Sequence, residues 1–219
     1  MRITFISVLT LLIITAACKK NQTFTIVGKV PDSVFNGSKV YLVALDAPVT
    51  RNVDSTIIEN GSFRFEIKAD SFTARILRIP AKYPDIIEDL VVIPEPGQIS
   101  AVLDSVSYGQ GTRLNNMLQQ WKERKHIHDS IQWDLYIQKN IKGLDQNIID
   151  SLMKVSEKMS EIIMSDNICM INENLNNGIG LLLFKIYFNA LPAGEKNYVM
   201  QMTGKKYFER DAELRKRLQ

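Results

Sequence analysis

The feature that most constrains the fold is a change of hydrophobic period near residues 109–111. Before it, apolar residues alternate with polar ones, as at Phe63, Phe65 and Ile67, a pattern typical of strands with one buried face. After it, apolar residues recur every three or four positions, as in amphipathic helices. The sequence therefore predicts an α+β fold, with an antiparallel β-sandwich or half-barrel over residues 23–108 and a helical domain over residues 112–219.

Turn signals divide the first region into about six to eight short strands. The pair Asn60-Gly61 is the strongest of these signals, because both central positions of a two-residue hairpin need positive φ. Alternation in the strands on either side places Phe63 and Phe65 in the predicted core.

Two long helices are predicted in the second region, separated by Gly143-Leu144-Asp145. The first begins near Thr112, a residue type suited to an N-cap, and its predicted buried face consists of Leu114, Leu118, Trp121, His128, Ile131 and Leu135. The second has apolar residues spaced 4-3-4-3, at Ile148, Leu152, Val155, Met159 and Ile162. That spacing is typical of the seam between paired helices, so the two form a predicted helical hairpin.

Beyond the hairpin, residues 174–180 are a predicted loop, within which Gly178-Ile179-Gly180 is a break rather than part of a phosphate loop. The nearly all-apolar stretch 181–191 follows as a predicted buried helix, too short to span a membrane. Residues 205–218 form a predicted charged terminal helix.

The N-terminal stretch 1–17 has a basic residue, an apolar run and small residues before Cys18, as secretory signals do. The segment Ile14-Thr15-Ala16-Ala17-Cys18 resembles a bacterial lipobox, which implies cleavage before Cys18, lipidation of that cysteine, and a tether over residues 18–22. The alternative is a transmembrane helix, but the apolar run is shorter than the roughly 20 residues that a span needs. Cys18 is therefore the predicted lipid-bearing site, and the membrane is the first predicted partner.

Charge and cysteine content exclude some functions. A formal net charge of +3 at pH 7 gives no case for nucleic acid binding. With Cys18 lipidated, Cys169 is the remaining thiol, so we expect no intramolecular disulfide and no dithiol exchange cycle within the chain. Cys169 continues the apolar spacing of the second helix, which predicts a buried packing role, with a mixed disulfide to a partner as the alternative.

The remaining candidate groups favour structural roles. His126 and His128 are two positions apart on a helix and do not face each other, so we predict no metal site and no cofactor. Several carboxylates are dispersed, and none is singled out as a catalytic pair, although a hydrolase stays open: Glu88, Asp89, Asp145, Asp150, Glu157 and Glu161. Five aromatic residues would be available for a carbohydrate-binding face: Tyr41, Phe63, Phe65, Tyr83 and Tyr108.

The order of several short segments resembles a known family. These are the lipobox, Phe24-Thr25-Ile26-Val27-Gly28, Val40-Tyr41-Leu42, Asp54-Ser55, Asn60-Gly61-Ser62-Phe63-Arg64-Phe65, Ile93-Pro94-Glu95-Pro96-Gly97 and Gly111-Thr112-Arg113-Leu114-Asn115. Over roughly residues 22–204 they resemble the uncharacterised β-plus-helical N-terminal domain of many Gram-negative lipoproteins. In that family a thioredoxin-like, peroxiredoxin-type domain usually follows, with a Trp-Cys-x-x-Cys motif. Here Trp121 and Trp133 neighbour no cysteine, so the resemblance carries over no catalytic residue.

The expected function is that of a non-catalytic, lipid-anchored cell-envelope protein that binds a protein partner. By the resemblance, that partner is a thioredoxin-like protein. Lys19 and Lys20 follow Cys18 where surface lipoproteins of this family's hosts tend to carry acidic residues, which favours the periplasmic side. The alternatives are a truncated thiol-disulfide oxidoreductase without its thioredoxin-like half, and a module that binds glycans or small ligands.

Overall fold

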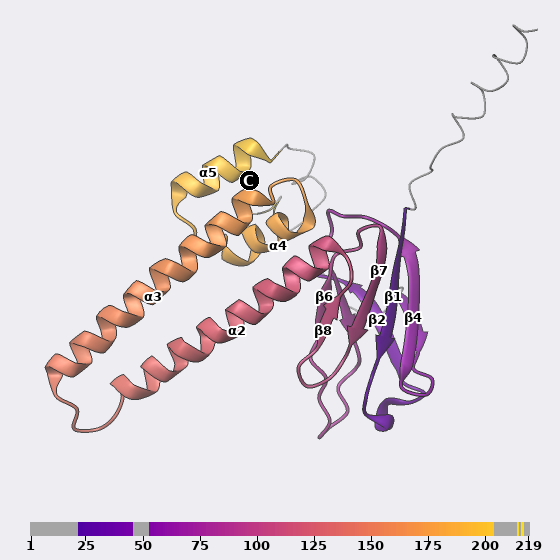
Figure 1. The fold of residues 1–219 in the computed structure, drawn as a ribbon, viewed down its shortest axis with the longest axis horizontal. Coiled ribbons are helices and arrows are strands. Elements are labelled where there is room, and N and C mark those ends of the chain that lie inside the picture. The colour runs from indigo at the N-terminus through magenta and orange to yellow at the C-terminus, as the bar shows by residue number, and fades with distance from the viewer. Residues whose placement is uncertain (1–21, 46–52, 204–213, 215, 217–219) are drawn as a thin grey trace, which may run out of the picture.

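In the residues that the structure describes, a two-sheet β region is followed by four α-helices. The computed structural model describes residues 22–45, 53–203, 214 and 216. One sheet has the strand order β4 (Ser62–Lys68), β1 (Thr23–Lys29), β7 (Gly97–Val102) and β8 (Tyr108–Gln110). The other has the order β3 (Asp54–Ile57), β2 (Lys39–Ala44), β5 (Arg75–Arg78) and β6 (Leu90–Val92), and a 3-10 turn, η2 (Ser33–Phe35), links β1 to β2. The predicted α+β class is confirmed (Figure 1).

One strand pair differs from an all-antiparallel arrangement. β1 and β7 pair in parallel, from Phe24 opposite Gly97 to Lys29 opposite Val102. Between β1 and β7 the chain forms the strands of the other sheet. β7 is therefore connected to β1 by a crossover rather than by a hairpin. Alternation in the sequence identifies which side chains face the core, but it does not fix which strands become neighbours.

The predicted turn at Asn60-Gly61 is confirmed, with φ of 50° and 69° at the two residues. Glu59 and Ser62 exchange backbone hydrogen bonds of 2.9 and 3.0 Å across it. The flanking strands β3 and β4 nevertheless belong to different sheets. The turn is therefore a corner at which the chain passes from one sheet to the other.

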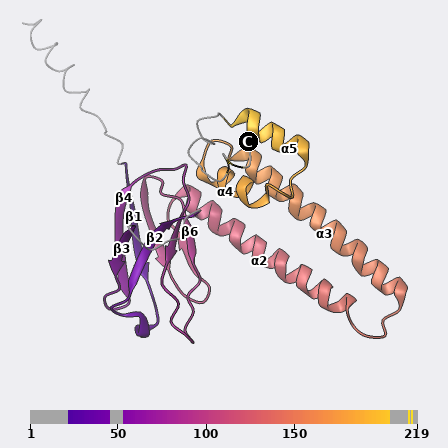
Figure 2. The same cartoon turned by 180° about the vertical axis from the view of Figure 1, so that it is seen from behind.

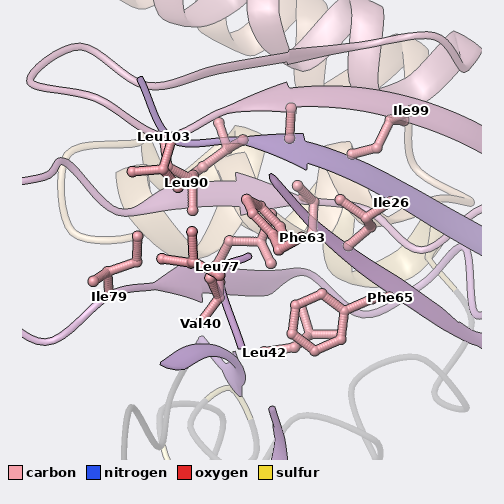
Figure 3. Close-up of a cluster of buried hydrophobic side chains, with 14 of the residues drawn as sticks. Ile26, Val40, Leu42, Phe63, Phe65, Leu77, Ile79, Leu90, Ile99 and Leu103 are labelled. Carbon is pink, nitrogen blue, oxygen red and sulfur yellow. The ribbon is translucent and has the colours of Figure 1, made fainter. Parts of the chain in front are cut away.

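Side chains from both sheets fill the space between them, as Figure 3 shows. Phe63 and Phe65 are both 5% exposed, and their rings meet edge to face with centroids 6.1 Å apart. Gly28 lies against this pair, because a Cβ at residue 28 would be 1.9 Å from Cζ of Phe63. Any larger residue there would displace a core ring.

The long helices α2 (Arg113–Lys139) and α3 (Gln146–Glu173) form the predicted antiparallel hairpin. Their 27 and 28 residues correspond to helices about 40 Å long. The shorter helices α4 (Gly178–Tyr187) and α5 (Ala193–Met202) pack at the base of the hairpin. Its distal half has no other described element beside it in either view (Figures 1 and 2).

Burial along α2 confirms its predicted face, since Leu114 and Leu118 are buried and Trp121, His128, Ile131 and Leu135 are half-buried. The predicted seam of α3 is wrong in part. Leu152 and Met159 are half-buried, but Ile148, Val155 and Ile162 are 52%, 52% and 46% exposed.

Polar contacts fix the rotation of α3 that exposes these residues. Nε2 of Gln132 donates to the carbonyl of Ser156 and to the hydroxyl of Ser160, each at 3.1 Å. Nε1 of Trp121 donates to Oδ1 of Asn167 at 2.9 Å. The seam therefore contains polar pairs that hydrophobic periodicity does not detect.

The all-apolar stretch forms the buried helix α4, with Leu182, Leu183 and Phe184 at most 4% exposed. This helix begins at Gly178, so the predicted break at residues 178–180 is wrong. Asn177 caps it by accepting a 2.9 Å hydrogen bond from the Ile179 N–H. A Cβ at Gly180 would lie 2.1 Å from the Asn174 carbonyl oxygen, so glycine here permits the close approach of α4 to the end of α3.

Asn115 joins the helices to the sheets. Its side chain accepts a hydrogen bond from the Ile93 N–H at 2.9 Å and donates to the Ile93 carbonyl at 2.7 Å. It also donates to Oγ1 of Thr112 at 2.8 Å. Thr112 occupies the predicted N-cap position, but its side chain makes no capping bond. Instead, Oε1 of Glu95 accepts from the Leu114 and Asn115 N–H groups.

Candidate functional site

A groove of about 630 Å³ lies where the β region meets the base of the hairpin. β6 and β8 contribute one wall, with Leu90, Val91 and Gly109. α2 and α4 contribute the other, with apolar side chains from Leu118, Trp121, Leu182 and Ile186. Because β6 is the last strand of its sheet, the groove follows a sheet edge.

Charged side chains at the groove are held in ion pairs. Nζ of Lys122 lies 2.6 Å from Oε2 of Glu88 and also donates to the Ser107 carbonyl at 2.5 Å. Asp89 pairs with Arg78, and this hydrogen bond raises the pKa of the Arg78 guanidinium. Asp129 pairs with Lys125. Each of the three carboxylates lining the groove therefore has a cation beside it, and the Glu88–Lys122 pair joins the β region to α2.

The structure does not gather the other carboxylates considered in the sequence into this groove. Asp145 caps α3 by accepting a 2.8 Å hydrogen bond from the Asn147 N–H. Asp150, Glu157 and Glu161 lie farther along the same helix, all exposed. Of the six carboxylates considered in the sequence, Glu88 and Asp89 line the groove. There they form the ion pairs with Lys122 and Arg78.

The two histidines lie on different sides of α2. His126 is exposed at the groove, whereas His128 is half-buried in a cavity of about 30 Å³ between α2 and α3. Among the described residues no group of three His, Cys, Asp or Glu side chains is placed to hold a metal ion.

The aromatic residues considered for carbohydrate binding do not share one surface. Phe63 and Phe65 are buried between the sheets, as alternation predicts. Tyr41 is half-buried in β2, Tyr83 is 92% exposed in the loop before β6, and Tyr108 is 42% exposed in β8. The burial of the two phenylalanines removes the centre of the proposed platform.

Cys169 is exposed on α3, so the predicted buried packing role is wrong. Rotation of α3 turns residue 169 outward, and Sγ donates to Oε1 of Glu173 one turn later, at 3.5 Å. This hydrogen bond, together with the negative charge of Glu173, raises the pKa of the Cys169 thiol. A raised pKa lowers the thiolate fraction at neutral pH, which is the reactive form.

Replacing Glu173 with glutamine is expected to speed alkylation of Cys169 at pH 8 by roughly two- to fivefold. The substitution removes the carboxylate that favours the protonated thiol, so the thiol pKa falls and the thiolate fraction at that pH rises. Iodoacetamide labelling of Cys169, read by mass spectrometry, measures the rate. Glu157→Gln, on the same helix, is the control and should leave it unchanged. Equal rates in the wild type and Glu173→Gln would contradict the assigned cause.

Large apolar side chains are exposed along the hairpin. Trp133 is 62% exposed, and its ring stacks on Tyr136 with centroids 5.5 Å apart and an interplanar angle of 22°. Seven other apolar side chains on the two helices and the loop between them are between 45% and 57% exposed: Ile127, Ile137, Ile141, Ile148, Met153, Val155 and Ile162. Of these residues, Trp133 and Tyr136 are in contact and Ile137 is next to Tyr136 in the chain, and exposed apolar groups of this kind mark interaction surfaces.

Three contacts of this site were not predicted from the sequence. Glu88 and Lys122 are 34 residues apart in the chain, and Glu95 lies 19 residues before the helix end that it caps. Only the fold brings them together. The stacked pair Trp133 and Tyr136 has a local signal, the i,i+3 spacing of two aromatic residues on one helix.

The predicted lipidation site, Cys18, lies outside the described residues, as do the signal segment 1–17, most of the tether and most of residues 205–218. Within the described part, Leu214 is fully buried against the helical core. Across the described residues, none of the helices combines the length and the apolar character needed to cross a membrane.

Residues 24–118 match the family model described as "Domain of unknown function (DUF4369)". No curated protein and no solved structure shows significant similarity to the chain. The matched segment runs from β1 into the second turn of α2. It therefore includes Glu95 and Asn115, the residues that join the sheets to the first helix, and the chain is similar to this uncharacterised domain over its β region and that junction.

Proposed function

We propose that this protein is a non-catalytic, lipid-anchored envelope protein that binds a protein partner through its helical hairpin. The observation that carries the proposal is the exposed aromatic patch of α2, made of Trp133, Tyr136 and Ile137. Tryptophan and tyrosine are enriched among the residues that dominate binding energy at protein interfaces. An exposed tryptophan stacked on a tyrosine is already ordered, so little side-chain entropy is lost when a partner covers it.

The shape of the molecule supports a binding arm held away from a membrane. Thr23 is five positions after Cys18, so lipidation at Cys18 would keep the start of β1 within about 17 Å of the bilayer surface. The tip of the hairpin and the start of β1 lie at opposite ends of the long axis of the molecule (Figure 1). The hairpin would then carry its aromatic patch into the periplasm.

The partner that we propose is a thioredoxin-like protein of the same compartment. Support comes from the resemblance of the chain to lipoprotein domains that precede a thioredoxin-like domain, and from the match of residues 24–118 to an uncharacterised domain family. In this arrangement the chain binds the thioredoxin-like protein and holds it near the membrane, and that protein supplies the dithiol. The exposed thiol of Cys169, with its raised pKa, is poorly suited to exchange at neutral pH.

Replacing Trp133 with alanine is expected to reduce recovery of the partner by at least tenfold. Loss of one dominant aromatic contact costs about 2 kcal/mol or more, and 1.4 kcal/mol is tenfold in affinity. The measurement is quantitative mass spectrometry of proteins that co-purify with the full chain from the membranes of expressing bacteria.

Tyr83→Ala is the matched control, because Tyr83 is a more exposed aromatic residue on the β region. The proposal is supported if a thioredoxin-like protein co-purifies with the Tyr83→Ala variant and does not co-purify with the Trp133→Ala variant. Equal recovery with both variants, or enrichment of no such protein by the wild type, contradicts it.

A further inference from the structure

Three loops of the β region meet at the end of the sandwich that lies far from the start of β1 (Figure 1). They connect β1 to β2 over residues 30–38, β5 to β6 over residues 79–89, and β7 to β8 over residues 103–107. β1 and β7 run in parallel, and β5 runs opposite to β2. β1, β5 and β7 therefore all end on this side. Two of the loops are also bonded to each other, since Nζ of Lys82 donates to the Val34 carbonyl at 2.9 Å.

The three loops enclose a pocket of about 330 Å³ with an apolar floor. Phe35, from the first loop, is 2% exposed, and Leu103, from the third, is fully buried. Ile87, from the second, is half-buried beside them. The floor therefore belongs to the core between the sheets, and the pocket opens from that core to the surface.

Large apolar side chains are exposed around the mouth of this pocket. Tyr83 is 92% exposed, Ile86 is 65% exposed and Val106 is 68% exposed. Ile86 lines the pocket, and the other two are next in the chain to the lining residues Pro84 and Ser105. Exposed apolar groups gathered around a pocket are typical of an interaction surface.

The charged side chains that line the pocket are carboxylates: Asp32, Asp85 and Asp104. None of the three belongs to an ion pair of the described residues. Asp32 accepts from the Val34 N–H at 2.9 Å, and Asp104 accepts from the Ser105 N–H at 2.7 Å. Each carboxylate has acceptor capacity beyond such a bond, so the pocket can accept hydrogen bonds from a donor that enters it.

The other charged residues of the three loops do not neutralise these carboxylates. Glu88 and Asp89 are held in ion pairs with Lys122 and Arg78. Lys82 is the remaining charged residue, and its ammonium donates to a backbone carbonyl. One lysine and three aspartates leave this surface with a net charge of −2.

Charges in the adjoining strands and turn do not reverse this sign. Lys29 and Lys39 are exposed, and the residues beside them, Gly28 and Val40, are buried. Successive side chains of a strand point to opposite faces, so both lysines lie on the outer faces of the sheets. Glu59, in the turn before β4, is exposed and adds a negative charge. The chain as a whole carries +3, so the pocket is a local site of opposite charge.

We infer that this pocket binds a segment of a protein partner in which an arginine lies next to apolar residues. The carboxylates require a cationic occupant, and the apolar floor suits the methylene stem of a long basic side chain. A guanidinium can donate to more than one carboxylate through its planar fork. The exposed ring of Tyr83 offers a face on which that cation can lie. Apolar neighbours of the arginine would cover Ile86 and Val106.

The same groups disfavour other classes of occupant. Across the described residues, no three His, Cys, Asp or Glu side chains are placed to hold one metal ion, so these aspartates do not converge on a single point. The phosphates of a lipid headgroup or a nucleic acid would be repelled by the carboxylates. This surface also lies far from the aromatic patch of α2 (Figure 1), so the inference goes beyond the partner binding proposed above.

Peptide binding to the full chain in a non-ionic detergent tests the inference. The probe is a fluorescein-labelled hexapeptide that alternates leucine with arginine, and fluorescence anisotropy measures its affinity. We expect it to bind at least tenfold more tightly than the same peptide with glutamate in place of arginine. Combined Asp85→Asn and Asp104→Asn should weaken binding of the arginine peptide at least tenfold. Asp54→Asn is the matched control, because Asp54 is an exposed carboxylate on β3, and it should leave the affinity unchanged.

Two further variants separate this surface from the hairpin. Tyr83→Ala should weaken binding of the arginine peptide, whereas Trp133→Ala should leave it unchanged. Three results would overturn the inference: equal affinity for the two peptides, unchanged affinity after Asp85→Asn with Asp104→Asn, or an equal loss with Asp54→Asn. Far-UV circular dichroism checks that the variants stay folded, which we expect because asparagine keeps the size of aspartate and can still accept from the Ser105 N–H.

Discussion

Replacing Asn115 with leucine is expected to lower the free energy of unfolding by about 3 kcal/mol. The side chain is 3% exposed and completes the hydrogen bonds of Ile93, which is fully buried. Leucine has a similar volume but neither donates nor accepts, so the Ile93 N–H would be left buried without its partner, and the Ile93 C=O would keep only the bond from the Glu95 N–H. A buried group left unpaired costs about 1–3 kcal/mol. Urea unfolding followed by circular dichroism measures the loss.

Asn116→Leu is the matched control, because Asn116 is exposed and makes one bond, accepting from the Gly111 N–H at 2.7 Å. Its cost should stay near 1 kcal/mol. In the wild type we expect a single transition, since Asn115 and Glu95 couple the first turn of α2 to the sheets. Equal midpoints for the two variants would show that the buried amide does not stabilise the junction.

Much of the β region follows from local pattern. The alternation through Phe63 and Phe65 predicts their burial, and both are 5% exposed. Asn60-Gly61 predicts a two-residue turn, and both residues have positive φ. Such features depend on neighbours in the sequence. The parallel pairing of β1 with β7 depends on how strands divide between two sheets, which local alternation does not encode.

The helical hairpin shows a second limit. A 4-3-4-3 spacing predicts that α3 pairs with another helix but does not say which flank of the apolar stripe faces it. Polar contacts decide this, through Gln132 with Ser156 and Ser160 and through Trp121 with Asn167. They turn Val155 outward and, with it, Cys169. The error at the thiol and the exposure of Ile148, Val155 and Ile162 on α3 therefore have one cause.

The candidate site was the least accessible to sequence reasoning, because its groups converge only in three dimensions. Glu88 and Asp89 are adjacent in the chain, where the sequence singles out no catalytic pair, and the fold directs them to Lys122 and Arg78. The first of these ion pairs joins the β region to α2, and the second lies within the β region.

Replacing Cys18 with serine is expected to abolish incorporation of labelled fatty acid into the protein, because a serine hydroxyl does not replace the thiol that carries the lipid. The N-terminal peptide of the wild type should begin at Cys18 and carry the added mass of its acyl chains. Cys169→Ser is the matched control, since it removes the other cysteine of the chain and should leave labelling unchanged. A wild-type chain with residue 18 unmodified and residues 1–17 still attached would contradict the anchor.

Lipidation at Cys18 would also limit how far the hairpin can lie from the membrane. Each buried CH₂ of an acyl chain contributes about 0.8 kcal/mol to membrane binding, so one chain holds reversibly and two or more hold stably. A stably held chain confines the hairpin to a layer near the bilayer, because the tether reaches about 17 Å and the hairpin arm is about 40 Å long. Confinement raises the effective concentration of hairpins relative to a partner in the same layer. Loss of Cys18 should therefore weaken partner binding without altering the aromatic patch.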